Sequence, residues 1–316
     1  MDRRRIKRYH NQYNDIPTHS VGDVIRWLLF RPKVRKPGKF HSSVKAVPAE
    51  RVESRSLQVT FINHSTVLIQ CDGYNILTDP IWSMRCGPLG ITGPKRLAPP
   101  GVLFENLPQI DLVLLSHNHY DHADLPTLKK LASVHQPIIC VPKGVKKWLE
   151  RHRINGAIEF DWWQEGPINE SLHVAFVPAQ HYARRGLFDH NRTLWGGFVI
   201  KTPHGTIFFA CDTAYGPHFA EIRKRYGAPG LALLPIGSYE PRWLMQGVHM
   251  SPEDAVMAHL DLNAAYSLGI HHGTFKLGDE DFYAPITELH SALIKHQVPP
   301  EQFLTLKNGE SWSILF

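Results

Sequence analysis

The sequence contains few cysteines and no segment of biased composition. Its 316 residues include four cysteines that stand far apart and form no C-x-x-C pattern, namely Cys71, Cys86, Cys140 and Cys211. In a chain of this length, scattered cysteines indicate free thiols in a reducing compartment and argue against a disulfide framework. The hydrophobic fraction of 43% and the charged fraction of 20% are typical of a soluble globular protein with a large core.

Long apolar runs are also absent. No stretch approaches the roughly 18–20 apolar residues of a membrane span, and no apolar segment of signal-peptide length follows the basic N-terminal residues. We therefore expect a cytoplasmic protein, with peripheral association at the inner face of the membrane as a further option. The sequence also lacks a G-x-S-x-G motif, so nothing indicates a serine nucleophile.

Positive charge exceeds negative charge, and much of the excess lies near the N-terminus. The formal net charge is +6, which favours anionic partners such as phosphates, acidic lipids or nucleic acid. The basic residues cluster within residues 3–8 and 31–39. Because they are confined to a terminal segment, we do not expect nucleic acid to be the partner.

Composition divides the chain into a basic N-terminal arm, residues 1–55, and a hydrolase-like body, residues 56–316. The arm contains four prolines and one short apolar patch, Val24–Phe30, which predicts a short helix. With its basic flanks the patch either packs on the body or touches a membrane surface. We favour packing, because few such patches are membrane anchors.

The body predicts strands that alternate with helices. The expected strands cover residues 58–62, 66–70, 75–78, 111–115, 137–141, 172–177, 194–201, 206–210, 231–235, 265–270 and 311–315. Helices are expected over residues 125–134, 145–151, 218–226 and 285–296 and from Ser251 onward, and a long irregular loop over residues 83–108. We expect Asp124 and Ser251 to cap the helices that follow them. This rhythm indicates one layered α/β domain without repeats of fixed period.

The most specific signal is an H-x-H-x-D-H motif directly after the buried strand 111–115. It contains four potential metal ligands within six residues, His117, His119, Asp121 and His122. Four such side chains cannot all point the same way from a helix or a strand, but on a tight loop they can face one cavity. Imidazole and carboxylate suit zinc and related divalent ions.

Three further donors each follow a predicted strand: His181, Asp212 and His271. Groups at the carboxyl ends of strands in an α/β sheet converge on one edge, where active sites form. Any one of them alone is most often a cap or a structural hydrogen-bonding group. Together with the H-x-H-x-D-H motif they make seven donors, enough for two metal ions.

Several other segments accompany the donors. They are Ile76-Leu-Thr-Asp79-Pro80-Ile-Trp-Ser83, Gly93-Pro-Lys95-Arg96, Leu194-Trp195-Gly196-Gly197, Phe208-Phe-Ala-Cys-Asp212-Thr213, Pro235-Ile-Gly-Ser-Tyr239-Glu240-Pro241-Arg242-Trp243 and Ile270-His271-His272-Gly273-Thr274-Phe275. In this order they resemble the metallo-β-lactamase fold superfamily, and within it the N-acylphosphatidylethanolamine-hydrolysing phospholipase D branch. The resemblance covers residues 56–316, and the arm before residue 50 carries no matching motif.

The resemblance implies an αββα sandwich, a four-layer arrangement with two zinc ions in a groove at one edge of its sheets. His117, His119 and His181 would bind the first ion and Asp121, His122 and His271 the second, with Asp212 bridging the two. Two departures stand out. The turn Asn63-His64-Ser65-Thr66 replaces the usual Gly-His-Ala-Thr, which makes His64 a packing or supporting residue, and His272 stands where this branch has Trp.

These expectations point to a zinc-dependent phosphodiesterase that cleaves N-acylphosphatidylethanolamine-like phospholipids with a metal-activated hydroxide. Asp121 and Asp212 are the expected catalytic carboxylates. Candidates for substrate contact are Tyr120, Tyr239, His249 and His272, although packing in the core is the alternative for both tyrosines. Iron or manganese in one site is compatible with the ligand types. The alternatives are a lactonase or another ester or amide hydrolase of this fold, and a membrane-associated binding protein without activity.

Overall fold

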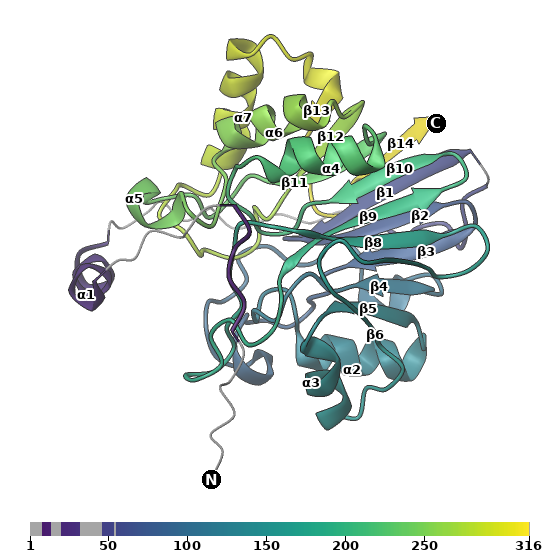
Figure 1. Cartoon of the computed structure of the whole chain (residues 1–316), viewed down its shortest axis with the longest axis horizontal. Helices are drawn as coiled ribbons and strands as arrows, with labels where there is room; N and C mark the ends of the chain where they lie inside the picture. Colours follow the sequence, from purple (N-terminus) through teal and green to yellow (C-terminus); the bar gives the residue numbers. More distant parts are fainter. Residues whose placement is uncertain (1–7, 14–19, 32–45, 54, 316) are drawn as a thin grey trace.

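Two β-sheets lie face to face, and helices cover the outer face of each (Figure 1). The computed structural model describes residues 8–13, 20–31, 46–53 and 55–315. The strands of the first sheet, in spatial order, are β14 (Ser311–Leu315), β1 (Ser56–Asn63), β2 (Thr66–Cys71), β3 (Tyr74–Thr78), β4 (Leu112–Leu114), β5 (Ile138–Pro142) and β6 (Ile158–Phe160). Those of the second sheet are β13 (Phe303–Leu304), β12 (Tyr266–Ile270), β11 (Leu231–Pro235), β10 (Gly205–Phe209), β9 (Gly196–Thr202), β8 (His173–Pro178) and β7 (Glu165–Pro167).

Helices pack on both outer faces. The first sheet is covered by α2 (Leu125–Val134) and α3 (Val145–Arg151), the second by α4 (His218–Tyr226), α6 (Pro252–Leu262) and α7 (Ala284–Lys295). The remaining helices are α1 (Val21–Phe30), α5 (Arg242–Met245) and the short 3-10 turns η1 (Pro88–Gly90), η2 (Phe104–Asn106) and η3 (Pro300–Gln302). The predicted αββα sandwich is therefore confirmed.

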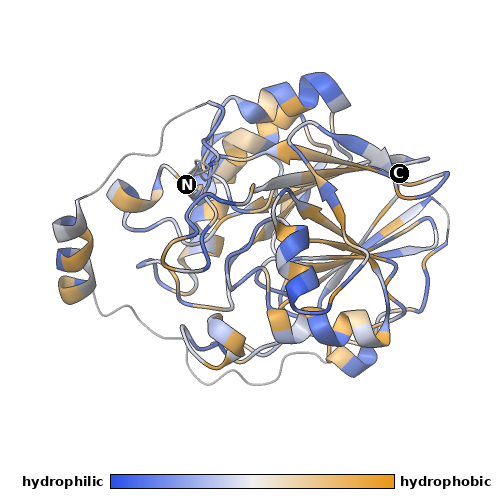
Figure 2. Ribbon diagram, turned by 60° about the horizontal axis from the view of Figure 1, so that its bottom comes forward, coloured by the Kyte–Doolittle hydropathy of each residue, from blue (hydrophilic) through white to orange (hydrophobic). Residues whose placement is uncertain are grey.

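Three apolar layers hold these elements together. The central layer lies between the sheets and includes Val59, Phe176 and Phe198, and the two outer layers join each sheet to its helices. Because both faces of most strands are covered, β2 and β11 are buried along their whole length, and Figure 2 shows strands that are orange over much of their course. All four cysteines are buried free thiols, as expected.

The sequence missed the shortest elements. Strands β6, β7 and β13 contain two or three residues each, too few to show a period of two. The expected cap at Ser251 is confirmed by a reciprocal bond with Asp254. Asp124 stands at the N-cap of α2 as expected, but its carboxylate makes no capping bond to the backbone of the helix and instead accepts hydrogen bonds from Ser83 and the Thr127 hydroxyl.

Each described part of the N-terminal arm, residues 8–13, α1 and residues 46–53, contacts the body. Residues 8–13 cross it as a short dark purple trace in Figure 1, whereas α1 lies at the periphery in both views (Figures 1 and 2). Trp27 and Arg31 bond to the Asp279 carboxylate at 2.5 and 2.8 Å. Most of the basic residues, within 1–7 and 32–45, lie outside the described residues. No described helix is long and apolar enough to cross a membrane.

Candidate metal centre

The seven predicted donors come together at one edge of the two sheets. The H-x-H-x-D-H motif forms the loop between β4 and α2, here called the cradle loop (residues 116–123). His181, Asp212 and His271 follow β8, β10 and β12 of the other sheet. Two of these turns are sharp, because Cys211 and His271 both have φ of 59°. Positive φ is uncommon for residues other than glycine and often marks functional sites.

The first pocket contains three imidazoles. His117 Nε2 lies 2.8 Å from His119 Nδ1, which lies 3.3 Å from His181 Nε2. These three nitrogen atoms are close enough to one another to bind a single metal ion. The His181 ring is oriented from behind, because its Nδ1 donates to the Val248 carbonyl at 2.9 Å and leaves Nε2 facing the pocket.

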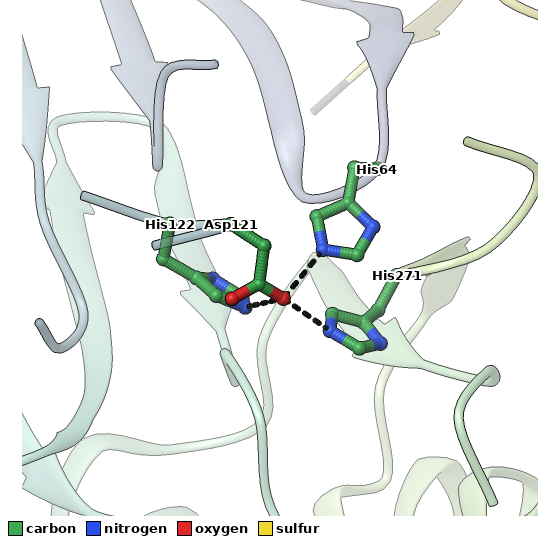
Figure 3. A group of neighbouring side chains, drawn as sticks. All are labelled: His64, Asp121, His122 and His271. Carbon is green, nitrogen blue, oxygen red and sulfur yellow. Dashed lines mark hydrogen bonds and ion pairs between the residues drawn. The ribbon is translucent and has the colours of Figure 1, made fainter. Parts of the chain in front are cut away.

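The second pocket is built around the Asp121 carboxylate (Figure 3). Asp121 Oδ2 lies 3.3 Å from His122 Nε2 and 3.6 Å from His271 Nε2. A third imidazole, that of His64, approaches the same oxygen at 3.1 Å. Sequence reasoning assigned His64 to packing or support, yet its nitrogen lies within the same donor group as the three predicted ligands.

Asp212 lies between the two pockets. Its Oδ2 atom is 3.1 Å from both His122 Nε2 and His271 Nε2, and 3.9 Å from His181 Nε2. One carboxylate thus faces imidazoles of both groups. This is the arrangement that a ligand shared by two ions requires.

The protonation of the donor set suits cations. Burial lowers the pKa of the imidazoles in the first pocket, to about 3 for His119 and about 4 for His181. Burial alone would raise the pKa of Asp121 and Asp212, but the charge of His122 together with hydrogen bonds from the neighbouring imidazoles outweighs burial and holds the pKa of both carboxyls well below their usual range. Neutral imidazoles and ionised carboxylates are the forms that bind metal.

The second pocket holds protons that a metal would displace. Burial lowers the pKa of His271, but the Asp212 and Asp121 carboxylates outweigh this effect and raise it to about 9. Among the described residues, His122 Nε2, His271 Nε2 and Asp212 Oδ1 are buried and make no well-aligned hydrogen bond, although the two imidazole nitrogens lie 3.1 Å from Asp212 Oδ2. Buried polar atoms are normally paired, so these three fit atoms that coordinate an ion.

A buried carboxylate behind the cradle loop orients His122. Asp79 Oδ2 accepts hydrogen bonds from His122 Nδ1 at 2.7 Å and from the Ser116 hydroxyl at 2.5 Å, and Asp79 Oδ1 accepts from the Ser116 backbone at 2.8 Å. This fixes the ring so that Nε2 faces the pocket. From the sequence, Asp79 is noted only as part of a motif. It also directly follows a predicted strand, which is the position that identified His181, Asp212 and His271 as candidate ligands.

Arg185 braces the cradle loop from outside. Its guanidinium donates to the Asn118 carbonyl at 3.0 Å and to the Ala123 carbonyl at 2.9 Å, on either side of the stretch from His119 to His122. It also lies over the rings of Tyr120 and Trp148, 4.0 and 4.4 Å from their centroids. A cation held between two aromatic faces and two carbonyls ties the loop after β8 to the cradle loop.

The predicted substrate residues have different positions. Tyr120 and His249 line a 540 Å³ cavity that is also lined by His119, Asp121, Asp212 and His271. His249 Nδ1 lies 4.0 Å from Asp212 Oδ2. His272 stacks on Phe61 and lines an adjoining 330 Å³ cavity. Tyr239 is 2% exposed and lines neither cavity, which agrees with the alternative of core packing.

Fold and site together define a metal-dependent hydrolase. The chain belongs to the β-lactamase superfamily, because the model of the family described as "Beta-lactamase superfamily domain" matches residues 74–272. Solved structures agree on the fold: a novel metallo hydrolase of Ignicoccus hospitalis has a TM-score of 0.62 at 20% identity, covering 83% of this chain and 99% of its own. An isothiocyanate hydrolase from Delia radicum gut bacteria also gives 0.62 at 20% identity, covering 81% and 98%.

Within that superfamily, the chain belongs to the branch of the N-acylphosphatidylethanolamine-hydrolysing phospholipases D. A relative of that name, phospholipase D 1 of Caenorhabditis elegans, is 34% identical over 284 residues, which are 85% of this chain and 79% of the relative. The mitochondrial enzyme of that name from Saccharomyces cerevisiae is 35% identical over 237 residues, 73% of this chain but half, 50%, of the yeast protein. An uncharacterized Mycobacterium tuberculosis protein is 39% identical over 247 residues, 77% of this chain and 65% of its own.

Proposed function

We propose that the chain is a phosphodiesterase of the phospholipase D type that uses two zinc ions and hydrolyses N-acylphosphatidylethanolamine-like phospholipids. The observation that carries this proposal is the position of Asp212, whose carboxylate faces two groups of donors in the wall of one cavity. The relatives named for this reaction support the substrate class. Iron or manganese in one site is an alternative that the ligand types allow.

The reaction adds water to the phosphorus atom and breaks its bond to the ethanolamine oxygen, giving phosphatidic acid and an N-acylethanolamine. Two divalent ions, when bound, would lower the pKa of a bound water and polarise the phosphoryl oxygens. We expect the Asp121 carboxylate to accept a hydrogen bond from the attacking water. We expect His249, which lines the same cavity, to contact the phosphoryl group.

The test uses purified protein with measured metal content and N-acylphosphatidylethanolamine in mixed micelles. In ¹⁸O-labelled water the label should enter phosphatidic acid, and Asp212→Asn should abolish turnover. Asp111→Asn, a carboxylate of the body outside the donor groups, is the matched control and should retain it. Full metal occupancy with turnover of lactones but of no phosphodiester would instead identify the enzyme as a lactonase.

We also propose that α1 contacts a lipid surface. Leu29 is 72% exposed and Phe30 is 79% exposed, and the exposed Arg26 stands on the same short helix. Apolar side chains beside basic ones are suited to the interface of an anionic membrane. Exposed Leu187 and Phe188, in the loop that lines the cavity, would face the same surface.

Charged substitutions in α1 test this contact. The double variant Leu29→Asp, Phe30→Asp should lose flotation with vesicles that contain phosphatidylserine but keep turnover of soluble bis-p-nitrophenyl phosphate. Ile294→Asp, at a position 67% exposed on α7, is the control and should still float. Undiminished flotation of the double variant would contradict the proposed contact.

A further inference from the structure

The N-terminal segment 8–13, which lies outside the region matched by the family model, crosses the body next to the candidate metal centre. It is attached along its length by four side-chain or backbone contacts. These are Arg8 to the His190 carbonyl, Tyr9 N–H to the Asn191 carbonyl, Trp163 to Gln12, and Tyr13 to the Glu221 carboxylate. The segment therefore spans from the loop after β8 to α4.

Asn11, in the middle of this segment, reaches the chain behind a predicted metal ligand. Its Oδ1 atom accepts a hydrogen bond from the backbone N–H of His181 at 3.2 Å. The same oxygen accepts from Trp195 Nε1 at 3.0 Å, and Trp195 is completely buried. The indole also donates to the Ala179 carbonyl at 3.0 Å, so Asn11 and Trp195 both hold the stretch that ends at His181.

With this contact, both the ring and the backbone of His181 are held by hydrogen bonds. The ring is held through Nδ1 by the Val248 carbonyl, and the backbone is held by Asn11 from a position 170 residues away in the sequence. The atom left over is Nε2, which faces His119 and Asp212. A shift of the backbone at residue 181 would move Nε2 relative to the two other imidazoles of the first pocket.

We propose that Asn11 is a positioning residue for His181, so that the N-terminal segment sets the affinity of the first metal pocket. The proposal rests on the metal centre proposed above, but it does not depend on the substrate. Groups that orient metal ligands typically change metal affinity by about 10–100-fold when removed. Because Asn11 acts through the backbone, we expect the lower end of that range, about 10-fold.

Three variants separate positioning from simple attachment of the segment. Asn11→Ala removes the acceptor, Asn11→Asp retains an acceptor oxygen, and Tyr13→Phe removes a different anchor of the same segment. In the apo protein, Asn11→Ala should speed hydrogen–deuterium exchange of the His181 amide. In titrations with Co²⁺ against a chelator it should weaken one of the two sites about 10-fold and change the Co²⁺ absorption spectrum. Asn11→Asp and Tyr13→Phe should behave like the wild type.

Unchanged exchange and Co²⁺ affinity in Asn11→Ala would overturn the proposal, as would an equal loss in Tyr13→Phe. The wild type provides a test that needs no variant. The amides of Tyr9 and His181 should exchange together, because both are protected by the same segment, and a His181 amide still protected after Tyr9 has exchanged contradicts the proposal. A wild type that binds Co²⁺ but turns over no phospholipid would refute the proposed substrate alone.

Discussion

If the centre binds two metal ions as proposed, Asp79→Asn should weaken one of the two sites without unfolding the protein. Asp79 is completely buried and receives three hydrogen bonds from Ser116 and His122. The backbone N–H of Ser116 can only donate, so the amide oxygen of the variant must remain at the Oδ1 position. The new NH₂ group then lies where Oδ2 accepted from His122 Nδ1.

The substitution therefore reverses the tautomer of His122. Facing an NH₂ group, Nδ1 must accept, and the ring proton moves to Nε2, the atom that lies 3.1 Å from Asp212 and faces the second pocket. A protonated nitrogen cannot bind metal. Loss of such an orienting carboxylate costs about 10–100-fold in affinity, which corresponds to about 1.4–2.7 kcal/mol.

Titration with Co²⁺ against a chelator measures this change directly. We expect one site of wild-type affinity and one weakened site, with the thermal unfolding of the apo variant recorded as a check on the fold. Asp111→Asn is the matched control, because that carboxylate also accepts a backbone N–H but lies outside the donor groups. Two sites of unchanged affinity in Asp79→Asn would refute the tautomer argument.

Three other substitutions test contacts elsewhere in the body. Arg185→Gln removes two charged hydrogen bonds to the cradle loop and should lower the free energy of unfolding in urea by about 3 kcal/mol. An unchanged urea midpoint would contradict a stabilising role for these two bonds. Burial lowers the pKa of His218 from 6.5 to about 3. Since the unfolded chain takes up this proton first, stability should fall from pH 6.5 towards pH 3 by up to about 1.4 kcal/mol per unit. Urea denaturation at a series of pH values should show that the stability of His218→Gln depends less on pH than that of the wild type. An identical pH dependence would exclude His218 as its source. Gly101→Ala should prevent folding, because the added Cβ would lie 1.8 Å from Gly309 N; a native circular dichroism spectrum would contradict this.

Most of the strands and helices could be predicted because they depend on local patterns, whereas the four-layer arrangement was expected only from the family resemblance. Buried strands such as β11 are continuous apolar runs, and α6 begins with a serine, a proline and two acids, so both are visible in a short window. The convergence of His181, Asp212 and His271 followed from their shared place after strands. The pairing of His64 with Asp121 could not be predicted, because it depends on how the β1–β2 turn meets the end of β12.

The contacts of the N-terminal arm could not be predicted from the sequence either, because they also join segments that are far apart in the chain. A basic segment with a short apolar patch carries no signal that Asn11 will meet His181, since nothing in either local sequence specifies the other. Asp124 shows the opposite failure. Its position before a helix predicts a capping bond to the backbone, but its carboxylate instead accepts hydrogen bonds from the hydroxyl of Thr127 in the same helix and from the distant Ser83.

The division of the donors between the two sheets has a consequence for the newly made chain. Proteins emerge from the ribosome N-terminus first, so the cradle loop is synthesised long before its partners. The first donor group lacks an imidazole until His181 has been made, and the second until His271 has been made. Strand β1 gains its outer neighbour only when β14, which follows every other strand, pairs with it. The second donor group can therefore bind metal only after the first has been completed, and a product truncated before His271 would carry an incomplete second pocket.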